Sequence, residues 1–190
     1  MTAQQIIDKR KELWNKSNDI EQDRKYRDAV ANEIIKDEAL REEIAKYPEL
    51  LIEMVLVVVN KDKKSVPFFL NHVQRLFIDK LNKSIKEFRT GDRLTLKFLV
   101  LKGRQQGFTT VITAYQLVCS ITRRNFEGFT VADEEGNAST IFQSKAKYMY
   151  EHLPEPLKPH EKYNSKKELL FDKLNASWEV RTVSSNIRAA

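Results

Sequence analysis

The chain has 190 residues, of which 41% are hydrophobic and 32% are charged, and this content suits one substantial buried core with an appendage rather than a disordered tail. The longest apolar run, residues 50–59, contains Glu53 and is well short of the roughly 20 residues that cross a bilayer, so we expect no membrane segment and no membrane partner. Cys119 is the only cysteine, which excludes an internal disulfide and favours a reducing cytoplasm.

The net charge of +6 is unevenly distributed. Residues 1–65 hold 13 Lys and Arg against 14 Asp and Glu, whereas residues 66–190 hold 20 against 13. The basic surplus of the second part suits a surface that faces a phosphate backbone. Because the lysines are scattered, a generally solvated basic surface explains the charge equally well.

The chain begins with a helical region. Residues 4–47 alternate charged and apolar residues at helical spacing, which predicts two or three amphipathic helices. The charged break at 61–65, just before Pro67, predicts a boundary. We therefore expect an N-terminal helical region at residues 1–65 and a second domain at residues 66–190.

The second part alternates helices and strands. A helix is predicted over 71–88, with one apolar face and with Gln74 and Arg75 beside that face. The predicted face consists of Val73, Leu76, Phe77, Leu81 and Ile85. Residues 95–101 are nearly all apolar, as in a strand buried on both faces of a parallel sheet. Further helices are predicted at 109–122 and 138–152, and further strands at 129–132, 169–171 and 178–183.

The segment that follows the strand predicted at 95–101 is typical of a nucleoside triphosphate site. It consists of Lys102, Gly103, Arg104, Gln105, Gln106, Gly107, Phe108, Thr109 and Thr110. In such a loop the backbone N–H groups converge on phosphates, a lysine neutralises charge, and a hydroxyl ligates Mg²⁺. Gly107 and Thr109 fit this geometry, whereas the usual pattern would place its first glycine at Lys102 and its lysine at Phe108. An ordinary strand, turn and helix with solvated basic residues is the alternative.

The same loop resembles the deviant Walker A loop of the large terminase subunits of tailed bacteriophages, the ATPase motors that package DNA into capsids. Upstream, residues 66–75 are similar to the segment that recognises adenine in that family, in which a glutamine reads the base edge. Downstream, residues 128–133, 138–154 and 180–186 follow the family's order of elements. The resemblance covers about residues 66–190. It implies an α/β fold with a P-loop NTPase-type parallel sheet, incomplete at the C-terminus, behind the helical appendage.

The resemblance also implies ATP and Mg²⁺ as ligands and assigns roles to residues. Lys102 and Arg104 would supply the catalytic positive charge, and the hydroxyl of Thr109 would ligate the metal. Gln74 would donate to and accept from adenine, although a surface glutamine is the alternative. The nucleotide-binding residues implied in this way are Gln74, Arg75, Lys102, Gly103, Arg104, Gln105, Gln106, Gly107, Phe108, Thr109 and Thr110.

Other family features cannot be found in the sequence. A terminase motor continues into a Walker B strand ending in Asp-Glu, a coupling motif and a nuclease domain, and by the resemblance these would lie beyond Ala190. We therefore expect an incomplete motor with weak or no hydrolysis. Asp133 and Glu134 end a predicted strand, but that strand comes earlier than the acid-bearing strand of the family. A strand end followed by a solvated helix start is the favoured interpretation of these acids.

The function implied is coupling of ATP hydrolysis to translocation of double-stranded DNA into a procapsid in the host cytoplasm. The implied partners are double-stranded DNA, the small terminase subunit and the portal protein, with a homo-oligomer in the assembled motor. Two alternatives stay open. One is a fragment of a helicase-like nucleic-acid translocase, which shares the order of elements. The other is a non-enzymatic adaptor or binding protein whose degenerate loop has lost its nucleotide affinity.

Overall fold

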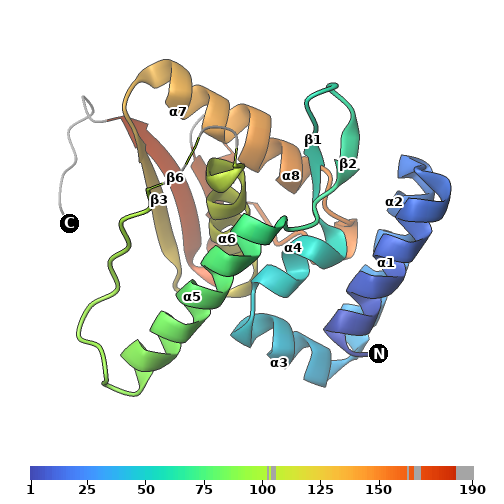
Figure 1. Ribbon diagram of the computed structural model, residues 1–190, viewed down its shortest axis with the longest axis horizontal. Coiled ribbons are helices and arrows are strands. Elements are labelled where there is room, and N and C mark those ends of the chain that lie inside the picture. Colours follow the sequence, from blue (N-terminus) through green and yellow to red (C-terminus); the bar gives the residue numbers. More distant parts are fainter. Residues whose placement is uncertain (102, 104–105, 162, 165–167, 183–190) are drawn as a thin grey trace.

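The computed structural model of the chain describes residues 1–101, 103, 106–161, 163–164 and 168–182 (Figure 1). The helices in this part are α1 (Ala3–Ser17), α2 (Ile20–Lys36), α3 (Glu38–Lys46), α4 (Glu49–Val55), α5 (His72–Arg89), α6 (Phe108–Thr122), α7 (Glu135–Ile141) and α8 (Tyr148–Glu151), with a π-helical segment η1 (Phe142–Lys147) and short 3-10 turns η2 (Glu155–Leu157) and η3 (Asp172–Leu174). The strands are β1 (Val57–Val59), β2 (Ser65–Pro67), β3 (Glu127–Ala132), β4 (Tyr163–Asn164), β5 (Glu168–Phe171) and β6 (Ala176–Thr182).

The helices predicted over residues 4–47 are confirmed as α1, α2 and α3. Each begins where a side chain accepts from the first turn, because the first amides of a helix have no partner within it. Thr2 forms a capping box with Gln5 at the start of α1. Asp37 ends α2 and caps α3, since its carboxylate accepts from the Leu40 amide at 3.1 Å. A single residue, Asp37, therefore ends one helix and begins the next.

A buried ion network fixes these helices to the rest of the chain. The guanidinium of Arg10 donates to both carboxylate oxygens of Asp23 at 2.7 and 2.9 Å, and Arg27 donates to the same carboxylate at 2.8 Å. Arg10 also donates to the carbonyls at the end of α4, and Arg27 donates to the carbonyl of His152 at 2.7 Å. Burial lowers the pKa of Arg10, and the hydrogen bond to Asp23 opposes this effect. Since all three charged groups are paired, the network is tolerated inside the protein.

The main sheet of the described part is small and mixed. Its strand order is β3-β6-β5-β4, in which β3 and β6 are parallel and the other pairs are antiparallel. A separate antiparallel hairpin joins β1 to β2. The mixed α/β architecture is confirmed, and so are the helix at 109–122 and the strands at 129–132 and 169–171, within two residues at each end; the strand predicted at 178–183 is confirmed as β6 up to Thr182, and residue 183 lies outside the described residues.

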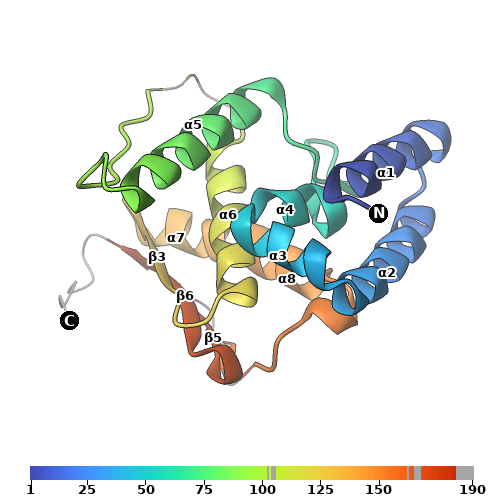
Figure 2. The same ribbon diagram turned by 90° about the horizontal axis from the view of Figure 1, so that it is seen from below.

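One face of this sheet is covered and the other is open. Helix α6 and the α7 to η1 segment lie beside β3 and β6 in both views (Figures 1 and 2). On the covered face, Trp178 is fully buried and stacks on Phe142 with ring centroids 5.6 Å apart. On the open face, Phe129 and Val131 of β3 are 59% and 40% exposed. The described residues therefore form two layers rather than the three of a doubly covered sheet.

The prediction of a buried strand at residues 95–101 is wrong. This segment has no regular structure, and Leu94, Leu99 and Leu101 are about 90% exposed. It runs beside α5, where the rings of Phe77 and Phe98 meet edge to face at 6.2 Å. An unbroken apolar run forms a strand only if a neighbouring strand is available for pairing. These residues do not pair with any strand in the described part.

The helix predicted at 71–88 is confirmed as α5, and its predicted apolar face is buried only in part: Phe77 and Leu81 pack against the core, and Ile85 is half-buried. Val73 and Leu76 are 37% and 49% exposed, whereas Gln74 and Ile78 are buried. On the side of Gln74, α5 packs against the start of α6, where Gln74 donates to the Gly107 carbonyl.

A single apolar cluster runs through the described residues from Ala3 in α1 to Val180 in β6. The boundary predicted between residues 65 and 66 falls inside strand β2 of the β1–β2 hairpin. Within the described part of the chain, no helix is both long and apolar enough to cross a membrane.

Candidate functional site

The structure brings part of the predicted phosphate loop to the beginning of α6. Gly107 has a left-handed conformation, with φ of 71°, and is the N-cap of this helix. No side chain caps the helix, and its first internal hydrogen bond runs from the Val111 amide to the Gly107 carbonyl at 3.0 Å. The amides of the first turn have no partner within the helix, so this end favours a negatively charged group.

Gln74 holds the carbonyl of Gly107. Its Nε2 donates to that oxygen at 3.1 Å, and its Oε1 accepts from the Asn71 amide at 3.0 Å in the capping box of α5. Asn71 in turn donates from Nδ2 to the Gln106 carbonyl at 3.4 Å. Gln74 is only 4% exposed, so it lies inside the interface rather than on the surface beside an apolar face. Its Oε1 and one N–H of its amide are engaged within the protein, and the adenine contact stays a prediction.

The contact between Gln74 and Gly107 leaves no room for a side chain at position 107. A Cβ there would lie 2.5 Å from Gln74 Nε2. The left-handed backbone therefore favours glycine at this position, and a Cβ would displace the Gln74 amide from its hydrogen bond.

Arg75 is directed to the other side of α5, toward Glu53. Its Nη2 donates to the two carboxylate oxygens at 2.8 and 2.9 Å, and Lys11 approaches one of them at 3.1 Å. The carboxylate also accepts from the Leu70 amide at 3.2 Å. The side chain of Arg75 is 44% exposed, but its charge is already balanced by a buried acid. To contact a nucleotide as predicted, the Arg75 guanidinium would have to bind the nucleotide while it remains paired with Glu53.

The threonines of the loop differ in their surroundings. Thr109 is exposed, as a metal ligand on a surface site would be, and its metal role stays a prediction. The hydroxyl of Thr110 accepts from Lys145 Nζ at 3.2 Å. Thr110 and Lys145 border a small cavity of about 40 Å³, which Val58, Val59, Ser144, Tyr148 and Met149 also line.

Lys145 was not predicted as a site residue. It belongs to η1, and it is half-buried, so that burial lowers its pKa. The only signal in the sequence was its place in the helix predicted at 138–152, next to the inward-facing Ala146. A cation held beside the first turn of α6 is an arrangement that suits a phosphate group.

The other loop residues fall into two groups. Lys102, Arg104 and Gln105 lie outside the described residues, so their predicted roles stay predictions. Phe108 is 7% exposed and packs edge to face on Phe77 at 5.4 Å, which anchors the first turn of α6 to α5. Gly103 is exposed.

The acids after β3 behave as the start of a helix. Asp133 accepts from the Glu134 amide at 3.0 Å and from Asn137 Nδ2 at 2.6 Å, and both acids are exposed. The hydrogen bond from Asn137 lowers the pKa of Asp133. This is the strand end and solvated helix start that we predicted.

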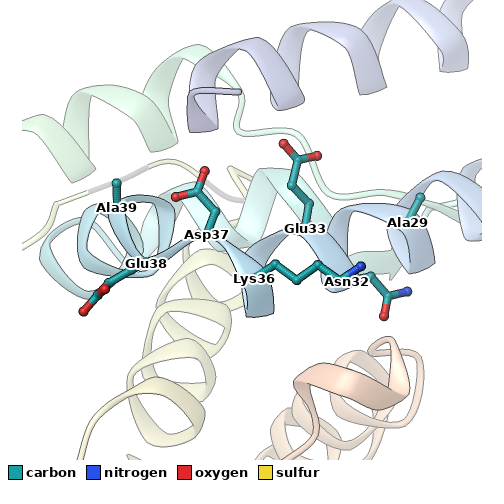
Figure 3. Close-up of a pocket in the computed structure, with 7 residues that line it drawn as sticks. All are labelled: Ala29, Asn32, Glu33, Lys36, Asp37, Glu38 and Ala39. Atoms are coloured by element: carbon teal, nitrogen blue, oxygen red, sulfur yellow. The ribbon is translucent and has the colours of Figure 1, made fainter.

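A hollow and a buried thiol elsewhere in the molecule are not arranged as sites. The hollow, of about 710 Å³, lies at the bend between α2 and α3, but its acids do not converge: Glu33 and Asp37 point to one side and Glu38 to the other (Figure 3). Glu33 also pairs with the N-terminal ammonium at 3.3 Å. In the interior, burial raises the pKa of Cys119 to about 11, so its thiol stays protonated at neutral pH.

No cluster of three or more His, Cys, Asp or Glu side chains suited to holding a metal occurs among the described residues. No protein-family model matches the chain, and no curated protein matches it at a significant level.

Proposed function

We propose that this chain is the ATP-binding part of a DNA-packaging motor of the terminase large-subunit type, which translocates double-stranded DNA into a procapsid. The observation that supports this proposal is the start of α6, where a left-handed glycine opens an uncapped helix and Lys145 stands beside Thr110. The proposal includes a P-loop-type core. It also includes the family's partners, namely the small terminase subunit and the portal protein in the host cytoplasm.

The described residues fit a bound triphosphate in three respects. The free amides of Phe108, Thr109 and Thr110 would face the phosphates, because the helix end carries partial positive charge. Lys145 would supply a cation, and the left-handed conformation of Gly107 opens the helix without a capping side chain. Mg²⁺, when bound, would neutralise charge on the phosphate oxygens, with Thr109 as its protein ligand.

Gln74 has a defined role in this proposal. By holding the Gly107 carbonyl, it sets the conformation of the loop and couples it to the start of α5. Its remaining N–H would donate to the adenine base. The same side chain would therefore both shape the loop and read the base.

The experiment is calorimetric titration of the chain with a non-hydrolysable ATP analogue, with and without Mg²⁺ and with the matching GTP analogue. We expect saturable Mg²⁺-dependent binding that is weaker for GTP. Thr109→Ala and Lys145→Met should each weaken binding at least about tenfold, a change of about 1.4 kcal/mol. The matched controls are Thr140→Ala on the exposed face of α7 and Lys147→Met in η1, which should bind as the parent does.

One observation favours the alternative of a non-enzymatic adaptor. Residues 94–101 do not pair with a strand in the described part, so the loop lacks the strand that normally holds a phosphate loop in place. A folded chain that binds neither nucleotide analogue would support the adaptor and contradict our proposal.

A further inference from the structure

A basic groove lies between the end of α3 and the C-terminal half of α5. Its volume is about 510 Å³, and four of the side chains that line it are cationic: Lys46, Lys83, Lys86 and Arg89. Tyr47 and Asn82 add polar groups to its lining, and none of the described residues that line it is acidic. Neither the phosphate loop nor the hollow at the α2–α3 bend shares any of these residues.

The cations form an ordered row. Lys83, Lys86 and Arg89 follow one another at three-residue intervals and are all exposed. Since an α-helix rises about 1.5 Å per residue, their Cα atoms are spaced about 4.5 Å apart along the axis of α5. Cations in the last turn also stabilise a helix through its dipole. That effect applies to Lys86 and Arg89 at the end of α5 and to Lys46 at the end of α3, but it does not explain Lys83, which comes before the last turn of α5, or the meeting of the two helix ends in one groove.

The charge of the groove is largely unbalanced. Among the described residues, Lys46, Lys86 and Arg89 form no ion pair, and Lys83 approaches Glu87 only at 4.0 Å. Glu87 is engaged more closely by Arg93 at 3.4 Å, outside the groove lining. A groove with several free cations attracts a polyanion, because each phosphate that it neutralises releases condensed counterions.

We propose that this groove binds the phosphate backbone of duplex DNA. A concave surface with cations on both walls receives a convex phosphate ridge, whereas a flat anionic bilayer cannot enter it. Binding of single strands relies on bases that stack on open aromatic rings. Tyr47 is the only aromatic side chain among the lining residues described, and Lys46 Nζ covers one face of its ring, 5.3 Å from the centroid. The lining therefore favours backbone contacts over base stacking.

Duplex DNA is also the substrate of the proposed motor, so the choice of this polyanion rests in part on the proposed function, while the groove itself rests on the geometry of α3 and α5. The two proposals concern different residues. Nucleotide binding measured on the same proteins therefore shows which of the two proposals has failed.

The test is fluorescence anisotropy of a labelled short DNA duplex titrated with the protein over a series of salt concentrations. The groove variant is Lys83→Ala, Lys86→Ala and Arg89→Ala combined. The control removes the same charge with Lys9→Ala, Lys25→Ala and Lys36→Ala, which lie on α1 and α2 and are not part of the groove lining.

We expect the groove variant to bind at least tenfold more weakly at low salt. The slope of log affinity against log salt should shrink by about 0.9 for each phosphate that the variant no longer neutralises. The control should retain most of the affinity, and both variants should keep the circular dichroism spectrum and the nucleotide binding of the parent. Lys86→Gln alone tests the same point if the triple variant unfolds, with an expected two- to threefold decrease in affinity.

Three results would overturn the proposal. The first is an equal decrease in affinity in the groove and control variants, which would mean that only the net charge matters. The second is tighter binding of a single strand than of the duplex, and the third is binding of acidic protein but not of DNA. If nucleotide binding fails while the groove variant still binds DNA more weakly than the control, the groove proposal stands and the proposed motor function does not.

Discussion

Gly107 and Gln74 form the most constrained contact at the start of α6. The glycine combines a positive φ with a carbonyl that accepts from a buried amide, so two separate physical requirements meet at one position. The sequence pattern indicated the glycine as part of a loop. It did not indicate that Gln74 would hold it, because the partners are 33 residues apart.

We predict that Gly107→Ala destabilises the protein. A left-handed backbone costs a non-glycine residue about 1–2 kcal/mol, and displacement of Gln74 removes a capping interaction, which costs about 1 kcal/mol more. The measurement is urea unfolding. Gly91→Ala is the control for backbone strain, since Gly91 has φ of 82° but nothing within 4 Å of an added Cβ. Equal destabilisation of the two variants would show that the contact with Gln74 contributes nothing.

Glu49 is a second residue whose surroundings allow a prediction about stability. Its Oε1 accepts from Asn82 Nδ2 at 2.6 Å, but its Oε2 is buried without a partner. Burial raises the pKa of this carboxyl above 4.5, and hydrogen bonds from its own backbone and from Asn82 oppose the shift. A carboxyl whose folded pKa is raised favours the folded state when protonated, and that contribution is lost as the pH rises through the folded pKa.

We therefore predict that Glu49→Gln is more stable than the parent at pH 7, because the amide keeps the bond to Asn82 without burying a charge. The advantage should shrink as the pH falls and should vanish below the ordinary pKa near 4.5. Denaturation midpoints across this pH range provide the measurement. A variant that is less stable than the parent at every pH would contradict the prediction.

At the scale of elements, α6 is joined to the sheet through one polar side chain. Gln116 Oε1 accepts from Trp178 Nε1 at 2.6 Å and from Thr130 Oγ1 at 2.7 Å, so the helix contacts β6 and β3 through the same atom. Gln116 Nε2 also donates to the Phe129 carbonyl at 3.4 Å. This network explains why the covered face of a small sheet tolerates a glutamine.

We predict that Gln116→Met destabilises the protein by about 1–3 kcal/mol, since it leaves the buried indole N–H of Trp178 without an acceptor. Gln116→Glu is the matched variant: its carboxylate keeps the acceptor for both donors, so it should be destabilised less. Free energies from urea unfolding decide between them. If the methionine variant is as stable as the parent, the network does not hold α6 to the sheet.

For several helices, the periodicity of apolar residues was sufficient to predict the element. Helices α1, α2, α5 and α6 follow from the spacing of apolar residues and, in the first three, from capping side chains, which act within a few residues of each other. The strand predicted at 95–101 failed because apolar composition does not specify a partner strand. The π-helical turn of η1 inside the helix predicted at 138–152 has no signature that we recognised in the sequence.

At the scale of the whole molecule, the N-terminal helices and the sheet region share one core. The cluster that includes Ile6 and Ile34 also includes Phe142 and Trp178. Arg27 adds a hydrogen bond from α2 to the carbonyl of His152, 125 residues later in the chain. The division into residues 1–65 and 66–190 stays a prediction. The shared core shows that the two parts pack together.

We predict a single cooperative unfolding transition. The two tryptophans report on different parts, since Trp14 lies in α1 and Trp178 in β6. In Trp14→Phe and Trp178→Phe, the remaining tryptophan fluorescence should follow the same urea curve as the circular dichroism of that variant. Separate fluorescence and circular dichroism transitions would instead establish that the two regions unfold independently.

The sequence by itself determined the local features of this protein: the helices within residues 4–47 and at 71–88, the glycine at 107, and the mixed α/β class. These depend on interactions between near neighbours in the chain, which leave a periodic or positional trace. Only the tertiary structure decided that Gln74 is buried against Gly107, that Lys145 meets Thr110, and that cations from α3 and α5 share a groove. Those contacts join residues separated by 33 positions or more, and their geometry depends on how whole helices pack rather than on any local pattern.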